Sequence, residues 1–269
     1  MRRFVGSERG AARRILEDWK NANRAAGMSL ATTRRRLSSL LALLHLAHEF
    51  DVIPWSIRLK LPGTTPIRDT RGPGRQAIMR MISLCRERGD DKGQRDTVLL
   101  SLMFYNALRA SEVLSIDLAH VDLQEDEVSI APKGKWDRQR IPIPRCTKEA
   151  LERWLEVRGD EPGPLFPSMQ PHRQGRADRL TYRGLYELVR KLGRQVGVAC
   201  HPHGLRHTAA SDLDRLTYGN VAWGMHLTRH ADPKTFLAYR DGRTNHMRAA
   251  AEILAHGQYV RTEPADGRF

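Results

Sequence analysis

Four kinds of side chain in this 269-residue chain form a set that suits chemistry on a phosphodiester. Arginine grips two phosphate oxygens with a planar fork and keeps its proton. Histidine and lysine can move protons, and a phenol can attack phosphorus once nearby cations stabilise the phenolate. In chain order the candidates are Arg109, Lys133, His203, Arg206, His230 and Tyr239. Together they provide cations to hold the anion, an acid, a base and a nucleophile.

Motif context distinguishes Arg109 and Arg206 from the other cations. A single arginine in a chain with 45 lysines and arginines is usually a solvated surface residue. Arg109, however, follows an apolar helical run in the segment A-L-R-A-S-E, and Arg206 lies in H-G-L-R-H-T. His203 precedes Arg206 by three residues, so on one helical turn both side chains are expected to face the same way. Without a metal, such preorganised cations can stabilise a phosphorane-like transition state.

A metal site is the rival interpretation of the same segment. His201, His203 and His207 crowd together, and His203 and His207 are one helical turn apart. The zinc-protease motif H-E-x-x-H is absent because Gly204 replaces its glutamate. We therefore predict no metal, and a packing or hydrogen-bonding role for His207.

Charge and composition point to a polyanionic partner in the cytoplasm. Lysine and arginine number 45 against 31 acidic residues, a net charge of +14, which favours a nucleic acid, most commonly DNA, as partner, with ribosomal or membrane-surface binding as the alternative. The three cysteines lie far apart without C-x-x-C spacing, which suits a reducing compartment. No signal peptide is visible, and no run reaches ~18 uninterrupted apolar residues. We expect a cytoplasmic protein without a membrane span.

The chain is expected to fold as two helical parts joined by a linker. Helices are predicted over residues 11–22 and 31–49, the second with Arg34, Arg35 and Arg36 near its start as candidate phosphate contacts. Residues 61–75 are rich in Pro, Gly and Arg. We place a DNA-binding domain at residues 1–62, the linker at 63–76 and a second domain at 77–269.

The second domain is predicted to be mainly helical with one small antiparallel sheet. Short alternating runs at 128–131 and 140–143 flank the segment K-G-K-W-D and predict a hairpin. Helices are expected at about residues 76–88, 92–108, 147–157, 181–196, 202–215, 218–228 and 245–255.

The three motifs together resemble the tyrosine recombinase, or phage integrase, family. Its signature is roughly A-L-R-x-S-E, then H-x-L-R-H-T, then G-H and a tyrosine about nine residues later. The resemblance runs from about residue 77 to 255. It implies a mainly α catalytic domain with a small antiparallel sheet, preceded by a helical (SAM-like) core-binding domain. The latter looks short here, because only its later helices have counterparts.

The resemblance also implies roles for individual residues. Arg109 and Arg206 would bind the scissile phosphate, His230 would hydrogen-bond it, and His203 would assist deprotonation of the nucleophile. A lysine on the hairpin would protonate the leaving 5′-oxygen. Lys133 fits the family spacing from Arg109 better, and Lys135 remains the alternative, since the hairpin is about one residue longer than usual.

Among six tyrosines, Tyr239 is the implied nucleophile, because it follows His230 by nine residues. Tyr259 is the second candidate. The implied reaction breaks and rejoins DNA through a 3′-phosphotyrosyl intermediate without a metal or other cofactor, and no G-x-x-x-x-G-K-[ST] motif occurs. The implied partners are double-stranded DNA, other copies of the chain in a homotetramer on two DNA sites, and an accessory DNA-bending protein.

Some features depart from the family pattern or stay open. Arg229 replaces the glycine expected before His230, at a tight helix end. The predicted helix at 245–255 could pack on its own domain or dock on a neighbouring protomer. The functional alternatives are a type IB topoisomerase-like strand transferase and a DNA-binding protein that keeps the fold without cutting.

Overall fold

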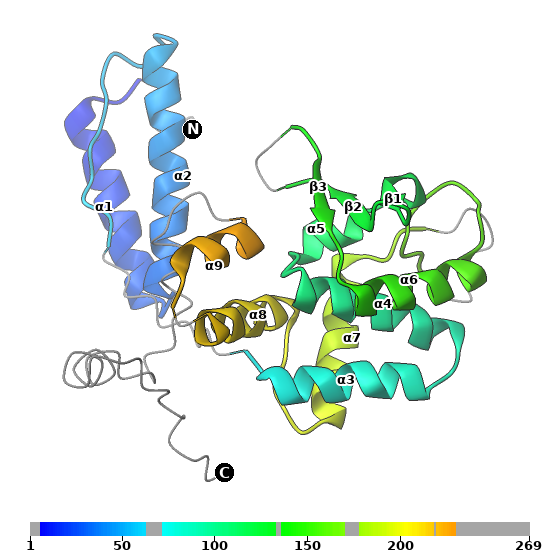
Figure 1. The fold of residues 1–269 in the computed structure, drawn as a ribbon. Coiled ribbons are helices and arrows are strands. Elements are labelled where there is room, and N and C mark those ends of the chain that lie inside the picture. The colour runs from blue at the N-terminus through cyan, green and yellow to red at the C-terminus, as the bar shows by residue number, and fades with distance from the viewer. Residues whose placement is uncertain (1–5, 63–71, 133–135, 170–177, 218, 230–269) are drawn as a thin grey trace, which may run out of the picture. The chain divides into compact units, whose positions relative to one another are not determined.

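The computed structural model of the chain describes residues 6–62, 72–132, 136–169, 178–217 and 219–229. Two compact units divide the chain, residues 1–69 and 70–269. The elements are helices with one small sheet (Figure 1), which confirms the predicted fold class. Within these ranges, no helix is long and apolar enough to cross a membrane.

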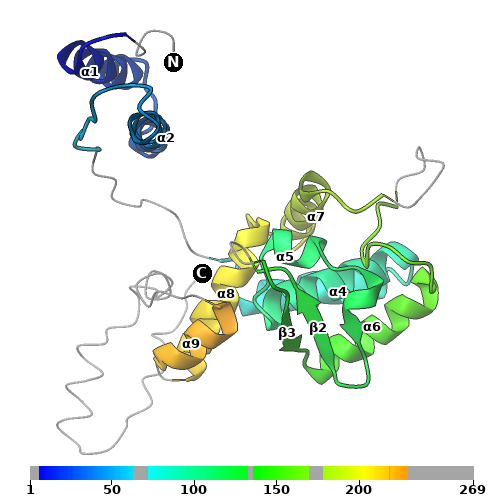
Figure 2. The ribbon, with the colours of Figure 1, turned by 90° about the horizontal axis from the view of Figure 1, so that it is seen from above.

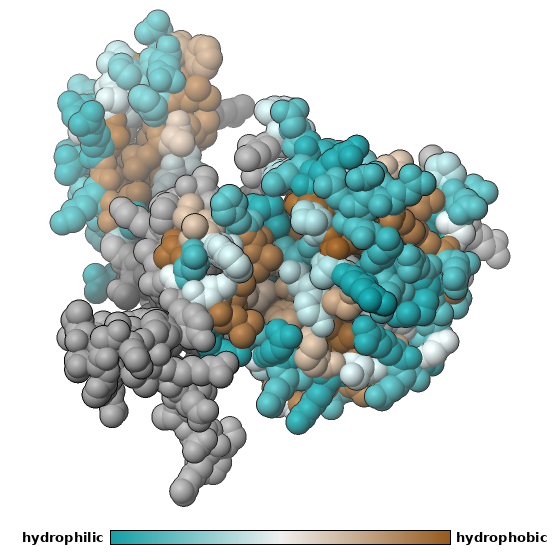
Figure 3. All heavy atoms as spheres, viewed as in Figure 1, coloured by the Kyte–Doolittle hydropathy of each residue, from teal (hydrophilic) through white to brown (hydrophobic). Residues whose placement is uncertain are grey.

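The first unit is a pair of packed helices, α1 (Arg9–Ala25) and α2 (Leu30–Glu49). Ser29 caps α2, since its hydroxyl accepts a hydrogen bond from the Thr32 N–H at 3.2 Å. The apolar faces of both helices meet the segment that follows α2 in one small core, made of Ala12, Leu16, Leu37, Leu44, Ala47, Ile53 and Trp55. A second set of apolar side chains on and after α2 stays exposed (Figure 3), namely Leu43, Leu46, Phe50 and Val52.

The second unit is built around the buried helix α4. Its helices are α3 (Arg75–Glu87), α4 (Asp91–Tyr105), α5 (Ala110–Leu114), the 3₁₀ helix η1 (Leu118–His120), α6 (Arg145–Arg158), α7 (Tyr182–Gln195), α8 (Pro202–Leu216) and α9 (Val221–Thr228). Helices α3, α6 and α8 pack against α4. Helix α9 packs against α8 (Figure 2). From Arg95 to Phe104 every residue of α4 is buried, so this helix forms the centre on which the others pack.

A three-stranded antiparallel sheet follows η1, with strands β1 (Val121–Asp122), β2 (Glu127–Ile130) and β3 (Gln139–Pro142) in that order. Val128 pairs with Ile141 across the β2–β3 hairpin, and both point into the core. The hairpin was predicted, whereas the two-residue strand β1 is too short to leave a pattern. Lys133 and Lys135 lie between β2 and β3, outside the described residues.

The predicted helix at 92–108 was too long, and the difference shapes the site. Helix α4 ends at Tyr105, and Ala107 takes a left-handed conformation with φ of 47°. Leu108 is fully buried in the turn rather than in the helix, so the apolar period continues past the last helical residue. Arg109 therefore becomes the N-cap of the five-residue α5, which periodicity could not reveal.

The segment before α3 packs tightly against α8. A Cβ atom on Gly72 would lie 2.0 Å from the Thr208 hydroxyl and 2.3 Å from the Gly204 carbonyl oxygen. The Gly74 N–H donates to the Thr208 hydroxyl at 3.3 Å, and Arg75 pairs with Asp212 at 3.1 Å.

We predict that Gly72→Ala destabilises the second unit by roughly 1–3 kcal/mol, because α8 must shift to admit the methyl group. Thermal unfolding followed by circular dichroism measures the change. Gly10→Ala is the matched control: nothing lies within 4 Å of its added Cβ in α1, so helix propensity predicts equal or higher stability. An unfolding temperature of the Gly72 variant equal to that of the wild type would contradict the close contact.

Candidate active site

The turn between α4 and α5 places Arg109 beside Glu112. The Arg109 backbone N–H donates to Glu112 Oε2 at 2.8 Å, and its Nη1 donates to Oε1 at 2.6 Å. Glu112 is the third residue of α5, so its carboxylate caps the helix and holds the arginine at once. Glu112 is fully buried, whereas 26% of the Arg109 side chain is exposed. The carboxylate thus holds the Arg109 guanidinium, while part of the side chain stays exposed to solvent.

Helix α8 brings Arg206 to the same carboxylate from another part of the sequence. Its side chain is buried, and it donates to the carbonyl oxygens of Ala107 and Thr228. Its Nη1 lies 4.0 Å from Glu112 Oε2. Arg206 therefore ties the α4–α5 turn to the end of α9. The two predicted arginines meet at one acidic residue.

A third arginine, which stands where the family motif has glycine, completes the cluster. Arg229 ends α9 in a left-handed conformation with φ of 54°. Its Nη2 donates to Glu112 Oε2 at 3.0 Å and to the Ala107 carbonyl at 3.2 Å. The signal in the sequence was an arginine in place of the glycine expected at a helix end. The contacts of its side chain depend on the tertiary structure and could not be predicted. We call Arg109, Arg206, Arg229 and Glu112 the arginine cluster.

The cluster has the electrostatics of an anion site. Burial raises the pKa of Glu112, but the Arg109 N–H and the charges of Arg229 and Arg109 outweigh it, so the pKa lies below its usual value. Burial also lowers the pKa of Arg229, although Glu112 opposes this shift. Three guanidinium groups around one carboxylate leave a surplus of two positive charges. A phosphate is a suitable counterion for such a surplus.

The histidines gather at the start of α8. His201 caps the helix, since its Nδ1 accepts from the Gly204 N–H at 3.2 Å. The His203 ring is edge-on to His207, with centroids 5.1 Å apart. His203 and Arg206 lie three residues apart on α8, as expected. His203 is exposed to solvent, however, whereas Arg206 is buried, so the two side chains do not share one solvent-facing surface. His207 is buried, as a packing residue would be. In the part of the chain that the structure describes, no group of three side chains suits a metal ion.

Other predicted site residues cannot be placed against the cluster. Lys133, Lys135, His230 and Tyr239 lie outside the described residues, as do Tyr259 and the predicted helix at 245–255. His230 directly follows Arg229 in the sequence. The described part of the chain thus carries the anion site but not the predicted nucleophile.

The three arginines predicted to contact DNA lie on the first unit. Arg34, Arg35 and Arg36 are all exposed on α2. The Nη1 of Arg34 donates to the Pro62 carbonyl at 3.0 Å, which places it where the described part of this unit ends. They form an exposed cationic patch on α2.

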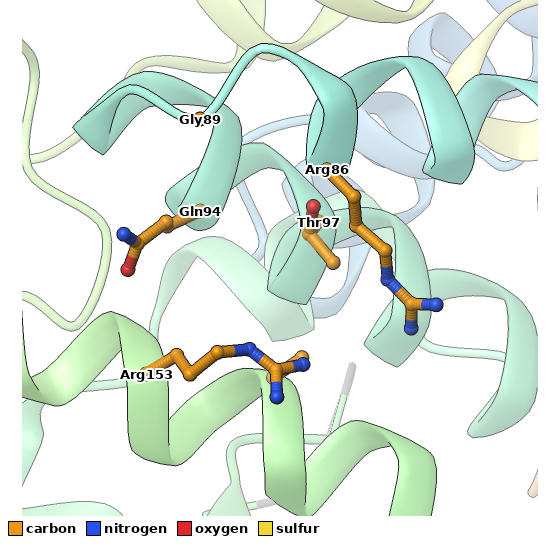
Figure 4. Close-up of a pocket in the computed structure, with 6 residues that line it drawn as sticks. Arg86, Gly89, Gln94, Thr97 and Arg153 are labelled. Atoms are coloured by element: carbon orange, nitrogen blue, oxygen red, sulfur yellow. The ribbon is translucent and has the colours of Figure 1, made fainter.

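A separate hollow opens between α3, α4 and α6 (Figure 4). It is lined by Arg86, Gly89, Gln94, Thr97, Ala150 and Arg153. None of these residues belongs to the arginine cluster.

Comparison with known proteins identifies the family. The model of the phage integrase family matches residues 75–246. A tyrosine recombinase of Synechococcus elongatus is 29% identical over 88% of this chain and 75% of its own length. Tyrosine recombinase XerC of Serratia marcescens is 30% identical over 82% and 76%, and XerC of Pseudomonas aeruginosa 35% identical over 65% and 56%. The chain thus spans between about half and three quarters of the length of these relatives.

Solved structures show the same fold. A XerH site-specific recombinase bound to a palindromic difH substrate aligns with a TM-score of 0.66 and 17% identity, covering 86% of this chain and 69% of that one. A lambda integrase dimer bound to a core site aligns with a TM-score of 0.63 and 15% identity, covering 86% and 64%. The chain belongs to the phage integrase family, and the relatives that it matches are tyrosine recombinases.

Proposed function

We propose that this tyrosine recombinase cleaves and rejoins double-stranded DNA at defined sites through a 3′-phosphotyrosyl intermediate. The observation that carries the proposal is the arginine cluster, in which arginines from two separate motifs converge on one buried carboxylate. Such a site binds a phosphate through preorganised donors and needs no metal to stabilise added charge on its oxygens.

In the proposed reaction the Tyr239 oxygen attacks phosphorus, and the bond from phosphorus to the 5′-oxygen breaks. His203 accepts the phenol proton, and His230 hydrogen-bonds the phosphate. Lys133, or Lys135 in its place, protonates the departing 5′-oxygen, for which an ammonium is better suited than a guanidinium. The free energy of the broken DNA phosphodiester bond is conserved in the bond between Tyr239 and the 3′-phosphate. Rejoining by a 5′-hydroxyl therefore requires no nucleotide cofactor.

The proposed partner is double-stranded DNA. The net charge of +14 supports it, and the XerH and lambda integrase structures to which this chain is similar contain DNA. We extend the proposal to a homotetramer on two DNA sites, with an accessory DNA-bending protein, acting in the cytoplasm and on the nucleoid. Residues 1–62 would form a short DNA-binding domain, 63–76 the connection and 77–269 the catalytic domain; the last residues of the connection, from Gly72, already pack on α8 and begin α3.

The cationic patch on α2 gives a quantitative prediction. Replacing Arg34, Arg35 and Arg36 together by alanine should lower affinity on all DNA sequences, since phosphate contacts carry no sequence information. The slope of log affinity against log salt should become less steep by roughly 2–3, about 0.9 for each phosphate that the arginines no longer neutralise. Titrations at several salt concentrations by fluorescence anisotropy measure it. Arg13, Arg14 and Arg24 on α1 are exposed and form the matched triple control. An equal decrease of slope in the control would show that only net charge matters.

The proposed function is tested by trapping the covalent intermediate on sheared genomic DNA of the source organism. A site-specific recombinase gives SDS-resistant adducts whose fragments share one sequence. Adducts without a common sequence, together with relaxation of supercoils by a monomer, would establish the topoisomerase-like alternative. Tight binding without adducts would establish a DNA-binding protein that does not cut.

A further inference from the structure

We infer that Arg229 is a positioning residue of the phosphate site: it fixes the end of α9 on the α4–α5 turn and, with Arg109, holds the Glu112 carboxylate. This inference rests on the proposed function and deepens it. The resembling family motif has glycine at this position, so the role belongs to this chain's own residue.

The backbone at Arg229 is strained. Its φ of 54° and ψ of 42° lie in the left-handed region, where a residue with a side chain is less stable than glycine. Its N–H still caps α9 by donating to the His226 carbonyl at 3.3 Å. Such a conformation persists only where surrounding contacts hold it. The contacts of the side chain therefore need to offset this cost.

The side chain supplies those contacts by joining three elements. Nη1 donates to the Asn106 carbonyl at 3.1 Å and to the Leu227 carbonyl at 2.9 Å. Nη2 donates to the Ala107 carbonyl and to Glu112. Only 10% of the side chain is exposed. One planar guanidinium thus links the end of α4, the start of α5 and the last turn of α9, directly before His230 in the sequence.

Arg229 also shares the Glu112 carboxylate with Arg109. Arg109 holds Oε1 at 2.6 Å and Arg229 holds Oε2 at 3.0 Å. Arg206 stays 4.0 Å from Oε2, beyond hydrogen-bond distance, and donates instead to the Ala107 and Thr228 carbonyls. Without Arg229, Oε2 would keep the Arg109 N–H at 2.8 Å but lose the guanidinium within hydrogen-bond distance, and the end of α9 would lose its contacts with the α4–α5 turn. Arg229 therefore helps to hold the Glu112 carboxylate, which in turn holds Arg109.

Arg229→Gly is the sharpest test, because glycine removes the clamp and relieves the backbone at the same time. We expect DNA affinity within about twofold of the wild type and a single-turnover rate of adduct formation 10- to 100-fold lower, the usual effect of removing one interaction that stabilises a transition state. Millimolar ethylguanidinium should restore part of the rate of this variant and leave the wild-type rate unchanged. Asp126→Gly is the matched control, since Asp126 is also left-handed, with φ of 55°, but lies in the β1–β2 turn.

Arg229→Lys keeps the charge and the left-handed side chain, so it tests the inference even if the glycine variant fails to fold. A single ammonium cannot reproduce four bonds in two directions. We expect its rate to fall at unchanged affinity. If the wild type forms adducts and either folded variant forms them at the same rate, the role of Arg229 is overturned, whereas the proposed function is not. Absence of adducts from the wild type itself would instead overturn the proposed function.

Discussion

Tyr239→Phe should abolish the SDS-resistant protein–DNA adduct and leave DNA binding intact. Phenylalanine keeps the ring but lacks the oxygen that forms the phosphotyrosyl bond, so the covalent route is closed. We expect adduct formation to fall by more than about a thousand-fold, as befits removal of a nucleophile. Denaturing gel electrophoresis of labelled DNA measures the adduct, and anisotropy measures binding.

Tyr259→Phe is the matched control for this prediction. The same hydroxyl is removed 20 residues further on, and adducts should form as in the wild type. Adducts that persist in Tyr239→Phe and vanish in Tyr259→Phe would identify Tyr259 as the nucleophile. Adducts that persist in both variants would exclude the two tyrosines together.

Glu112→Gln should cost the second unit about 3 kcal/mol of stability near neutral pH. The amide has almost the same shape, but it leaves Arg109, Arg206 and Arg229 together without their shared anion, and removing one partner of a buried ion pair is strongly destabilising. Urea unfolding followed by circular dichroism gives the difference. Glu149→Gln is the control: its pair with Arg145 is exposed, so stability should change by no more than about 0.5 kcal/mol.

The same substitution predicts a pH dependence. The pKa of Glu112 is below its usual value in the folded protein, so its carboxylate stabilises the fold at every pH above the pKa of the unfolded chain. This contribution is lost as the pH falls through the lower folded pKa. The stability difference between wild type and Glu112→Gln should therefore be full at neutral pH and shrink below about pH 4. A difference that is absent at pH 7 would contradict the proposed charge balance.

Much of the fold follows from local pattern, and the exceptions have physical causes. Helices such as α2 and α8 begin and end close to the predicted residues, because an apolar stripe and a capping side chain mark them. The short α5 and the left-handed Ala107 escaped prediction, since the turn buries Leu108 and so continues the apolar period.

The parts of the candidate site that lie within sequence motifs could be predicted. Arg109 and Arg206 were chosen from their motifs and meet at one carboxylate. Glu112 stands in the quoted A-L-R-A-S-E segment, and a glutamate three residues after a helix N-cap is a readable capping signal. Arg229 was not predictable, because its contacts join residues more than a hundred positions apart. The roles of Lys133, His230 and Tyr239 stay predictions.

The most direct test of the account is to locate the covalent bond itself. Wild-type adducts would be trapped, digested with nuclease and trypsin, and analysed by mass spectrometry. Cleavage after lysine and arginine places Tyr239 in the peptide 235–240 and Tyr259 in the peptide 249–261, so the two are separable. We predict a nucleotide attached through its 3′-phosphate to Tyr239. A nucleotide on any other residue, or attached through a 5′-phosphate, would contradict the account.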